Sequence, residues 1–204
     1  MSATTDLVIA VLIKDFVTAK SRLAPSLSAH ERERLARLTA RRAVRAAAAV
    51  APAVAVCGSA EAARLAATCG AEAIVEAKPD GQNRAAQVAI DAALRRGALA
   101  VLLLSSDLPG VTAVAIRRLL RAAGDGLEPL AVAARAAGRQ GTNALLLRPP
   151  QDFALHFGQG SLQLFAAEAS RRGRRFVVHD DPALALDLDE PGDLVAWREQ
   201  RRSA

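Results

Sequence analysis

Three aspartates are the side chains of this chain best suited to chemistry, because they stand in two short clusters, each just after an apolar run that reads as a buried strand. Asp107 follows one run. Asp187 and Asp189 end the other run two positions apart, which puts both on one face of a strand. Two bare carboxylates about 4 Å apart repel each other by about 4 kcal/mol at an effective dielectric constant near 20. A divalent cation relieves this repulsion, so the three carboxylates predict a metal site.

A basic loop directly after the first apolar run adds positive charge that such a site can use. Residues 14–22 contain Lys14, Lys20 and Arg22, and the whole chain has only three lysines against 24 arginines. Lysine binds phosphate oxygens as a compact charge and arginine as a planar fork. The loop therefore predicts triphosphate binding. The alternative for this segment alone is an ordinary exposed basic loop.

Two glycine-containing segments could bind the rest of a phosphorylated ligand. In the turn 78–83, Gly81 lets the backbone approach a ligand and Asn83 can pair with a base edge or a ribose. Farther on, Thr142 precedes a strand and Ser161 opens a helix after a Gly-rich run, an arrangement that can form an anion cradle. The alternatives are an ordinary turn for the first segment, and a hairpin turn with a serine N-cap for the second.

The elements that must position these residues follow βαβ order, because apolar runs alternate with amphipathic segments throughout the chain. Strands are expected at 7–13, 53–57, 74–75, 99–104, 131–134, 144–147, 176–178 and 185–188; helices are expected at 28–50, 59–70, 83–96, 112–123, 161–172 and from 191. The predicted fold is α/β: one domain over 1–204 with three α-β-α layers and a mostly parallel central sheet. Ligands bind beyond the carboxyl ends of such strands, where Asp107 and the 14–22 loop fall.

Composition excludes several classes of protein. The formal charge is +6 and the pI about 10.5, but there is no Tyr, one Trp and five Phe, so the stacking aromatics typical of nucleic-acid binders are scarce. A net positive charge without such aromatic residues favours polyanionic small molecules as the ligands. The apolar stretches are too short or too Ala-rich for a membrane span and no leader opens the chain, so a cytoplasmic protein is expected. Cys57 and Cys69 read as buried thiols, and no P-loop motif is present.

In this order, the segments resemble the 2-phospho-L-lactate or phosphoenolpyruvate guanylyltransferases, which activate a small phosphorylated three-carbon acid in coenzyme F-420 biosynthesis. The resemblance covers almost the whole chain. Its matching pieces are Lys14 with Ala19–Leu23, Gly81 and Asn83, Asp107–Pro109, Gly141–Pro150, Phe157–Ser161, and Leu186–Asp189 with Pro191 and Asp193–Leu194. The specific part is Gly-Thr-Asn-Ala-Leu together with Phe-Gly-x-Gly-Ser. Asp-Leu-Pro after a strand is shared with many nucleotidyltransferases.

The resemblance implies a compact nucleotidyltransferase fold related to GT-A glycosyltransferases, and it implies roles for particular residues. Mg²⁺ would be held by Asp107, Asp187 and Asp189; GTP by Lys14, Lys20, Arg22, Gly81 and Asn83; and the acceptor by Thr142, Gly158 and Ser161, with Lys14, Lys20, Arg22 and Asp107 catalytic. Two departures from the family pattern concern the acceptor preference more than the reaction. Asp15-Phe16 stands where Pro-Leu is more usual, and Arg139-Gln140 where another glycine is common.

The expected reaction is attack by a phosphate oxygen of the acceptor on the α-phosphorus of GTP, with release of pyrophosphate. Phosphoenolpyruvate, 2-phospho-L-lactate and 3-phospho-D-glycerate stay open as acceptors, and the protein is expected to be a monomer or homodimer. The alternatives are a sugar-1-phosphate or molybdopterin-type nucleotidyltransferase, a GT-A-like glycosyltransferase and, remotely, a basic nucleic-acid-binding module. Asp107→Asn is expected to remove most turnover at little cost in stability, because a carboxylate leaves a mutually repelling cluster.

Overall fold

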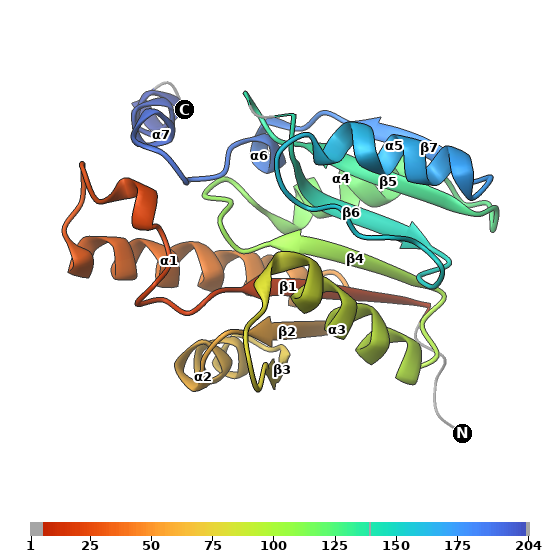
Figure 1. The fold of residues 1–204 in the computed structure, drawn as a ribbon, viewed down its shortest axis with the longest axis horizontal. Coiled ribbons are helices and arrows are strands. Elements are labelled where there is room, and N and C mark those ends of the chain that lie inside the picture. Colours follow the sequence, from red (N-terminus) through yellow and green to blue (C-terminus); the bar gives the residue numbers. More distant parts are fainter. Residues whose placement is uncertain (1–5, 139, 203–204) are drawn as a thin grey trace.

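One seven-stranded sheet runs through the computed structural model, which describes residues 6–138 and 140–202 (Figure 1). The strand order is β3-β2-β1-β4-β6-β5-β7, so β4 lies at the centre, as its apolar sequence predicts. The strands are β1 (Leu7–Ile13), β2 (Ala53–Cys57), β3 (Glu72–Val75), β4 (Ala100–Ser105), β5 (Leu130–Arg135), β6 (Thr142–Arg148) and β7 (Arg175–His179).

The sheet is parallel except around β6. The pairs β1·β2, β1·β4, β2·β3 and β5·β7 are parallel, whereas β6 runs antiparallel to both β4 and β5. The α/β class and the mostly parallel sheet are therefore confirmed. Because β6 is reversed, it begins at the edge of the sheet where β1 and β4 end.

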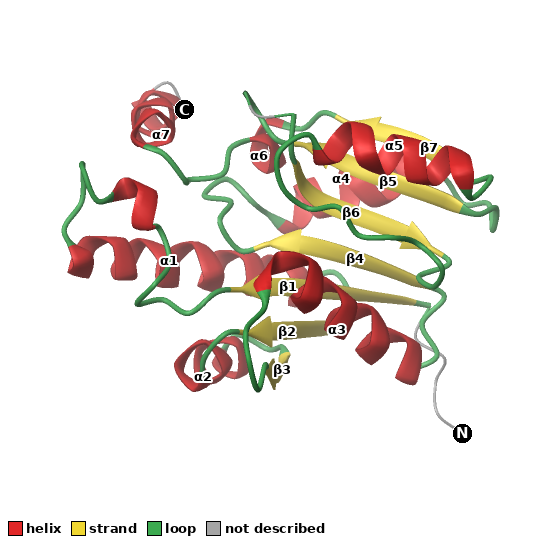
Figure 2. Cartoon of the chain, viewed as in Figure 1, coloured by secondary structure: helices red, strands yellow, loops and turns green. Residues whose placement is uncertain are grey.

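Helices cover both faces of the sheet, which gives the three predicted layers (Figure 2). α1 (Ala29–Ala48), α2 (Ala60–Thr68) and α4 (Ala113–Ala123) pack on one face, and α3 (Gly81–Arg95) and α5 (Ser161–Arg171) pack on the other. Along β1, Ile9 and Val11 point to the first layer while Val8 and Ala10 point to the second. This burial on both faces explains why the strand is a continuous apolar run.

The helix starts follow the signals in the sequence. Ser28 and Glu31 form the capping box that opens α1, and Ser59 and Thr112 each accept a backbone N–H as the N-caps of α2 and α4. Among the residues that the structure describes, no helix combines the length and the apolar character needed to cross a lipid bilayer.

The strand expected at 185–188 is wrong. A short helix, α6 (Pro182–Ala185), ends there, because Pro182 occupies its first turn and the Asp181 carboxylate accepts the N–H of Ala183. The chain then continues without regular structure to α7 (Pro191–Arg202). Leu186 and Leu188 are nevertheless buried, in a small cluster with Leu23 and Leu35. Burial alternates along this segment, so Asp187 and Asp189 are both less buried than the two leucines.

Candidate functional site

A cavity of about 990 Å³ lies beyond the ends of β1 and β4 and the start of β6. Its lining includes predicted residues from segments far apart in the sequence: Lys14, Lys20, Arg22, Asp107, Thr142, Gly158, Asp187 and Asp189. They meet because the carboxyl ends of parallel strands share one edge of the sheet and the reversed β6 contributes its beginning to the same edge. The structure thus brings together the basic loop, the aspartates and the Gly-Thr-Asn segment.

Lys20 and Asp107 form an ion pair in the lining of this cavity. The Lys20 side chain is only 1% exposed, and its Nζ lies 2.9 Å from Asp107 Oδ1. Apart from this ion pair, the buried ammonium has no hydrogen-bond partner among the described residues. Lys20 also has φ +62°, a left-handed conformation that costs energy for a residue other than glycine. A lysine ammonium carries three donors, so Lys20 has donors left for an anion bound beside Asp107.

The segment that carries Asp187 and Asp189 is fixed beside Asp107 by backbone contacts. The N–H of Leu188 donates to the carbonyl of Asp107 at 3.2 Å, and the Asn143 amide donates to the carbonyls of Leu184 and Ala185 at 2.9 and 3.0 Å. Asn143 is therefore a positioning residue. The sequence indicates Asn143 only as part of the Gly-Thr-Asn-Ala-Leu motif and does not indicate this role.

The three aspartates line one cavity, in which Asp107 and Asp189 each lie beside a cation. Asp107 pairs with Lys20, and Asp189 Oδ2 lies 2.9 Å from Nη1 of Arg22, whose side chain is 67% exposed. Within residues 6–138 and 140–202, no group of three or more Asp, Glu, His or Cys side chains is arranged to hold a metal ion. The magnesium assignment stays a prediction based on the donor chemistry.

Two of the three predicted acceptor residues line the same cavity, and the third contacts one of them. Thr142 and Gly158 line the cavity, and Gly158 has φ +134°, a conformation that favours glycine. Ser161 is fully buried, and its hydroxyl donates to Thr142 Oγ1 at 3.1 Å. Ser161 therefore orients the threonine hydroxyl, and a ligand in the cavity would meet Thr142 first.

The two residues predicted from the turn before α3, Gly81 and Asn83, have different surroundings. Gly81 lines a second, smaller cavity of about 390 Å³, together with Lys14 and Asp107. Asn83 instead engages the backbone of Phe157: its Oδ1 accepts the Phe157 N–H at 2.7 Å, and its Nδ2 donates to the Phe157 carbonyl at 3.4 Å. Asn83 thus ties the start of α3 to the loop that carries Gly158.

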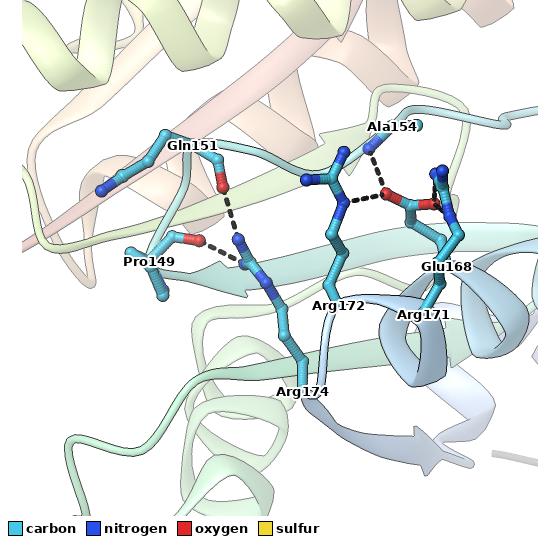
Figure 3. A network of polar contacts seen from close by, with 7 residues as sticks. All are labelled: Pro149, Gln151, Ala154, Glu168, Arg171, Arg172 and Arg174. Carbon is cyan, nitrogen blue, oxygen red and sulfur yellow. Dashed lines mark hydrogen bonds and ion pairs between the residues drawn. The ribbon is translucent and has the colours of Figure 1, made fainter.

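A network of polar contacts holds the earlier part of that loop, at residues 149–154 (Figure 3). The buried Glu168 carboxylate accepts from Arg171, Arg172 and the N–H of Ala154, and Arg174 donates to the carbonyls of residues 149 and 151. Hydrogen bonding to Arg171 is the main cause that lowers the pKa of Glu168 to about 2. The acceptor loop is therefore held at both ends, by Asn83 and by α5.

The departures from the family pattern have structural explanations where the structure describes them. The Asp15 carboxylate accepts the N–H of Val17 at 2.9 Å and so closes the turn of the basic loop. Phe16 is buried, and the Arg37 guanidinium lies 5.3 Å from its ring centre. Arg139 lies outside the described residues. The carbonyl of its neighbour Gln140 accepts the N–H of Leu162 at the start of α5.

The two cysteines and the arginines of α1 lie outside the proposed site. Cys57 and Cys69 are both buried free thiols, as predicted, and burial raises the pKa of Cys57 to about 12. The arginines of α1 lie mostly on its exposed face. Arg42 in addition donates to the carbonyl of Pro109, two residues after Asp107.

Sequence reasoning missed two further residues, Gly58 and Glu76. Gly58 follows β2 and lines the smaller cavity; a Cβ there would lie 2.9 Å from the backbone nitrogen of Asp15, so only glycine allows this approach. A glycine directly after a strand end is the signal that could have found it. Glu76 follows β3 and lines the same cavity. It belongs to no motif, so only its place in the fold indicates a role.

Comparisons with known proteins show which family and which proteins the chain resembles. The model of a family described as "Guanylyl transferase CofC like" matches residues 7–197. The chain is 37% identical to a phosphoenolpyruvate guanylyltransferase of Sphaerobacter thermophilus, over 90% of this chain and 88% of that protein. It is 44% identical to one of Rubrobacter xylanophilus, over 56% of this chain; that match spans just 55% of the relative's length.

A solved structure shares the fold. A protein from Desulfovibrio desulfuricans G20, described as a nucleotide-diphospho-sugar transferase, superposes with a TM-score of 0.79 over 98% of this chain and 90% of its own. Its sequence identity is 17%, so this likeness concerns the fold alone.

Proposed function

Because the chain belongs to the guanylyl transferase CofC-like family, we propose that it transfers the GMP group of GTP to a phosphorylated three-carbon acid and releases pyrophosphate. Phosphoenolpyruvate is the first acceptor to test, since the two relatives that match at 37% and 44% identity are named for it. The guanosine diphosphate-linked product would be the activated acid of coenzyme F-420 biosynthesis.

The observation that carries the proposal is the buried Lys20 ammonium. It lies 2.9 Å from Asp107, has hydrogen-bond donors left over, and faces a cavity of about 990 Å³. Burying an ammonium costs several kcal/mol unless anions compensate it, and one carboxylate accounts for only part of its bonding capacity. A phosphate oxygen of GTP would complete it. Lys14 and Arg22 line the same cavity and add charge for the rest of the triphosphate.

The reaction asks the protein mainly to bring two anions together. The acceptor's phosphate oxygen is ionised at neutral pH, so no residue has to activate it as a nucleophile. Thr142, oriented by Ser161, would donate its hydroxyl to the acceptor phosphate. Lys14, Lys20 and Arg22 would offset the charge on the triphosphate and on the departing pyrophosphate, which is where electrostatic stabilisation contributes most.

Magnesium fits the donor chemistry of the site. Asp107, Asp187 and Asp189 line one cavity, and carboxylate oxygens are the ligands that Mg²⁺ takes in phosphoryl-transfer sites. We propose that these three carboxylates would hold the ion, while the Lys20 ammonium and the Arg22 guanidinium stay beside Asp107 and Asp189. When bound, magnesium would supply positive charge beside the phosphates.

Incubation of the protein with GTP, magnesium chloride and each acid in turn tests the reaction directly. Pyrophosphate release and the mass of the product are measured with phosphoenolpyruvate, 2-phospho-L-lactate and 3-phospho-D-glycerate, and with a sugar 1-phosphate as the competing class. A guanylylated three-carbon acid is expected, and chelation by EDTA should abolish its formation until magnesium is restored. Absence of product with all three acids, or product only with the sugar phosphate, would refute the proposal.

Lys20→Met provides the site-specific arm of this experiment, with Lys78→Met as its matched control. Both changes remove one ammonium, but Lys78 is exposed in the turn before α3. We expect kcat to fall about 100-fold or more for Lys20→Met, since a charge aimed at the transition state is lost. Lys78→Met should retain activity close to that of the unmodified protein. Equal activities of the two variants would remove Lys20 from the mechanism.

A further inference from the structure

The smaller cavity contains a polar group that the proposed reaction does not use. The cavity measures about 390 Å³, opens beside Lys14 and Asp107, and has mostly apolar walls from Leu12, Ile13 and Ala85. Sites of this size and character hold small flat molecules, with a few polar groups that set orientation. Among the described residues, the acidic side chains in its lining are those of Asp15, Glu76 and Asp107.

Glu76 is held in place but lacks a partner for one oxygen. Its backbone N–H donates to the carbonyl of Cys57 at 3.0 Å, which fixes the residue at the end of β3. Its Oε1 is buried and has no hydrogen bond within the part of the chain that the structure describes. Burial raises the pKa of Glu76 against the opposing effect of Arg84. A buried acceptor left unpaired costs about 1–3 kcal/mol, so its presence in a ligand-sized cavity calls for a donor from outside the chain.

The donors can be identified from the chemistry of nucleobases. Guanine presents two adjacent donors on one edge, N1–H and the 2-amino group, and an ionised carboxylate is an acceptor with two oxygens that matches such a pair. Adenine offers an acceptor at N1 and lacks the 2-amino group, so it would leave the carboxylate facing a lone pair. Lys14 and Asp107 line both cavities, so a base in the smaller one would place its phosphates towards the larger one.

We propose that the smaller cavity binds the guanine base and that Glu76 determines base specificity by accepting hydrogen bonds from N1–H and the 2-amino group. This inference rests on the proposed use of GTP and adds the residue that selects it. A site that loses a matched hydrogen bond to a charged group loses about 1.5–3 kcal/mol, which is about 10- to 100-fold in affinity. ITP, which lacks only the 2-amino group, should therefore bind at least about 10-fold more weakly than GTP, and ATP more weakly still.

A change of specificity in Glu76→Gln is the sharper test. The amide offers one acceptor and one donor, which match N1–H and the 2-oxo group of xanthine, whereas the carboxylate repels that oxo group. The affinity ratio of XTP to GTP should rise about 100-fold or more in this variant. Glu72→Gln is the matched control: it makes the same change at the first residue of β3, at a carboxylate that is 63% exposed and paired with Arg96.

Affinities are measured by calorimetry with magnesium chloride and GTP, ITP, XTP or ATP, without any acceptor acid, so the result does not depend on turnover. Equal ratios in the two glutamine variants, or equal binding of GTP and ITP by the unmodified protein, would overturn the inference. The second comparison decides the question if Glu76→Gln fails to fold. Selective GTP binding without product formation would support the base assignment and refute the proposed reaction, whereas product formation with equal use of GTP and ITP would do the reverse.

Discussion

The ion pair between Lys20 and Asp107 changes what substitution of either residue should do. The sequence suggests that Asp107→Asn relieves repulsion among carboxylates, but the structure places Asp107 beside a buried ammonium at 2.9 Å. Removing the carboxylate leaves that charge without its anion, so a loss of stability of about 2–4 kcal/mol is expected alongside the loss of turnover.

A double-mutant cycle measures this coupling. Asp107→Asn, Lys20→Met and the double variant are compared by urea unfolding, and the double variant should be more stable than the sum of the single effects predicts, by about 1–3 kcal/mol. The Arg22–Asp189 pair is the control cycle, since Arg22 is 67% exposed and such a pair contributes about 1 kcal/mol or less. Additive effects in the Lys20–Asp107 cycle would contradict the structural interpretation.

At the scale of elements, close backbone packing sets the position of the basic loop. Gly58, at the end of β2, lies against the backbone of residues 14 and 15, and an added Cβ would meet Asp15 N at 2.9 Å. Gly58→Ala should therefore displace the loop that carries Lys14 and Lys20. We expect kcat/KM to fall about 10- to 100-fold, since a displacement of about 1 Å can cost that much, and stability to fall by about 1–3 kcal/mol.

The control for this change is Gly192→Ala in α7, where an added Cβ meets nothing within 4 Å and φ is not positive. This variant should be as active and at least as stable as the unmodified protein, because alanine favours helix more than glycine does. Steady-state kinetics and thermal unfolding of both variants give the comparison. Normal kinetics in Gly58→Ala would show that the loop tolerates the displacement.

The helix α5 holds the acceptor loop through a carboxylate whose ionisation should affect stability in acid. The pKa of Glu168 is about 2 in the folded protein, below the ordinary value of 4.5, mainly because Arg171 donates to it. A lowered folded pKa stabilises the protein above the unfolded pKa, and this contribution is lost as pH falls from about 4.5 towards 2. Glu168→Gln should remove that contribution.

Thermal unfolding between pH 7 and pH 3 checks this prediction. Glu168→Gln should be less stable than the unmodified protein at pH 7, by about 1–3 kcal/mol, and the difference should shrink as the pH falls. Glu128→Gln, at a glutamate that is 54% exposed and paired with Arg175, is the control and should change little at either pH. A difference that stays constant with pH would mean that Glu168 acts through packing rather than charge.

For the molecule as a whole, sequence patterns could predict whatever depends on local periodicity and capping. The long apolar runs predicted β1, β2 and β4, and Ser28, Ser59 and Thr112 predicted helix starts that the structure confirms. The run at 185–188 wrongly predicted a strand, because a buried extended segment has the same alternation of apolar and polar residues as a strand. This alternation does not show whether the segment has hydrogen-bonded neighbours in a sheet.

Site residues could be predicted from the sequence where they belong to a motif. They could not be predicted where their role depends on contacts between segments far apart in the chain. Lys20, Asp107 and Thr142 belong to recognisable segments, and the structure brings them to one cavity. Glu76 has no motif, and its place in the smaller cavity follows from β3 lying beside β2 at the edge of the sheet. Asn143 was noticed for its motif, but its bonds to the carbonyls of residues 184 and 185 depend on the course of the chain after α6.

The net charge of the whole molecule should control how fast it captures substrate. The formal charge is +6, and both proposed substrates are anions that meet a cavity edged by Lys14, Lys20 and Arg22. Long-range attraction raises association rates and is screened by salt, whereas contacts inside a cavity are screened much less. From about 50 to 300 mM sodium chloride, kcat/KM for GTP should fall about 3- to 10-fold while kcat changes little. Sucrose at matched viscosity is the control, and a kcat/KM that does not respond to salt would show that the surface arginines take no part in capture.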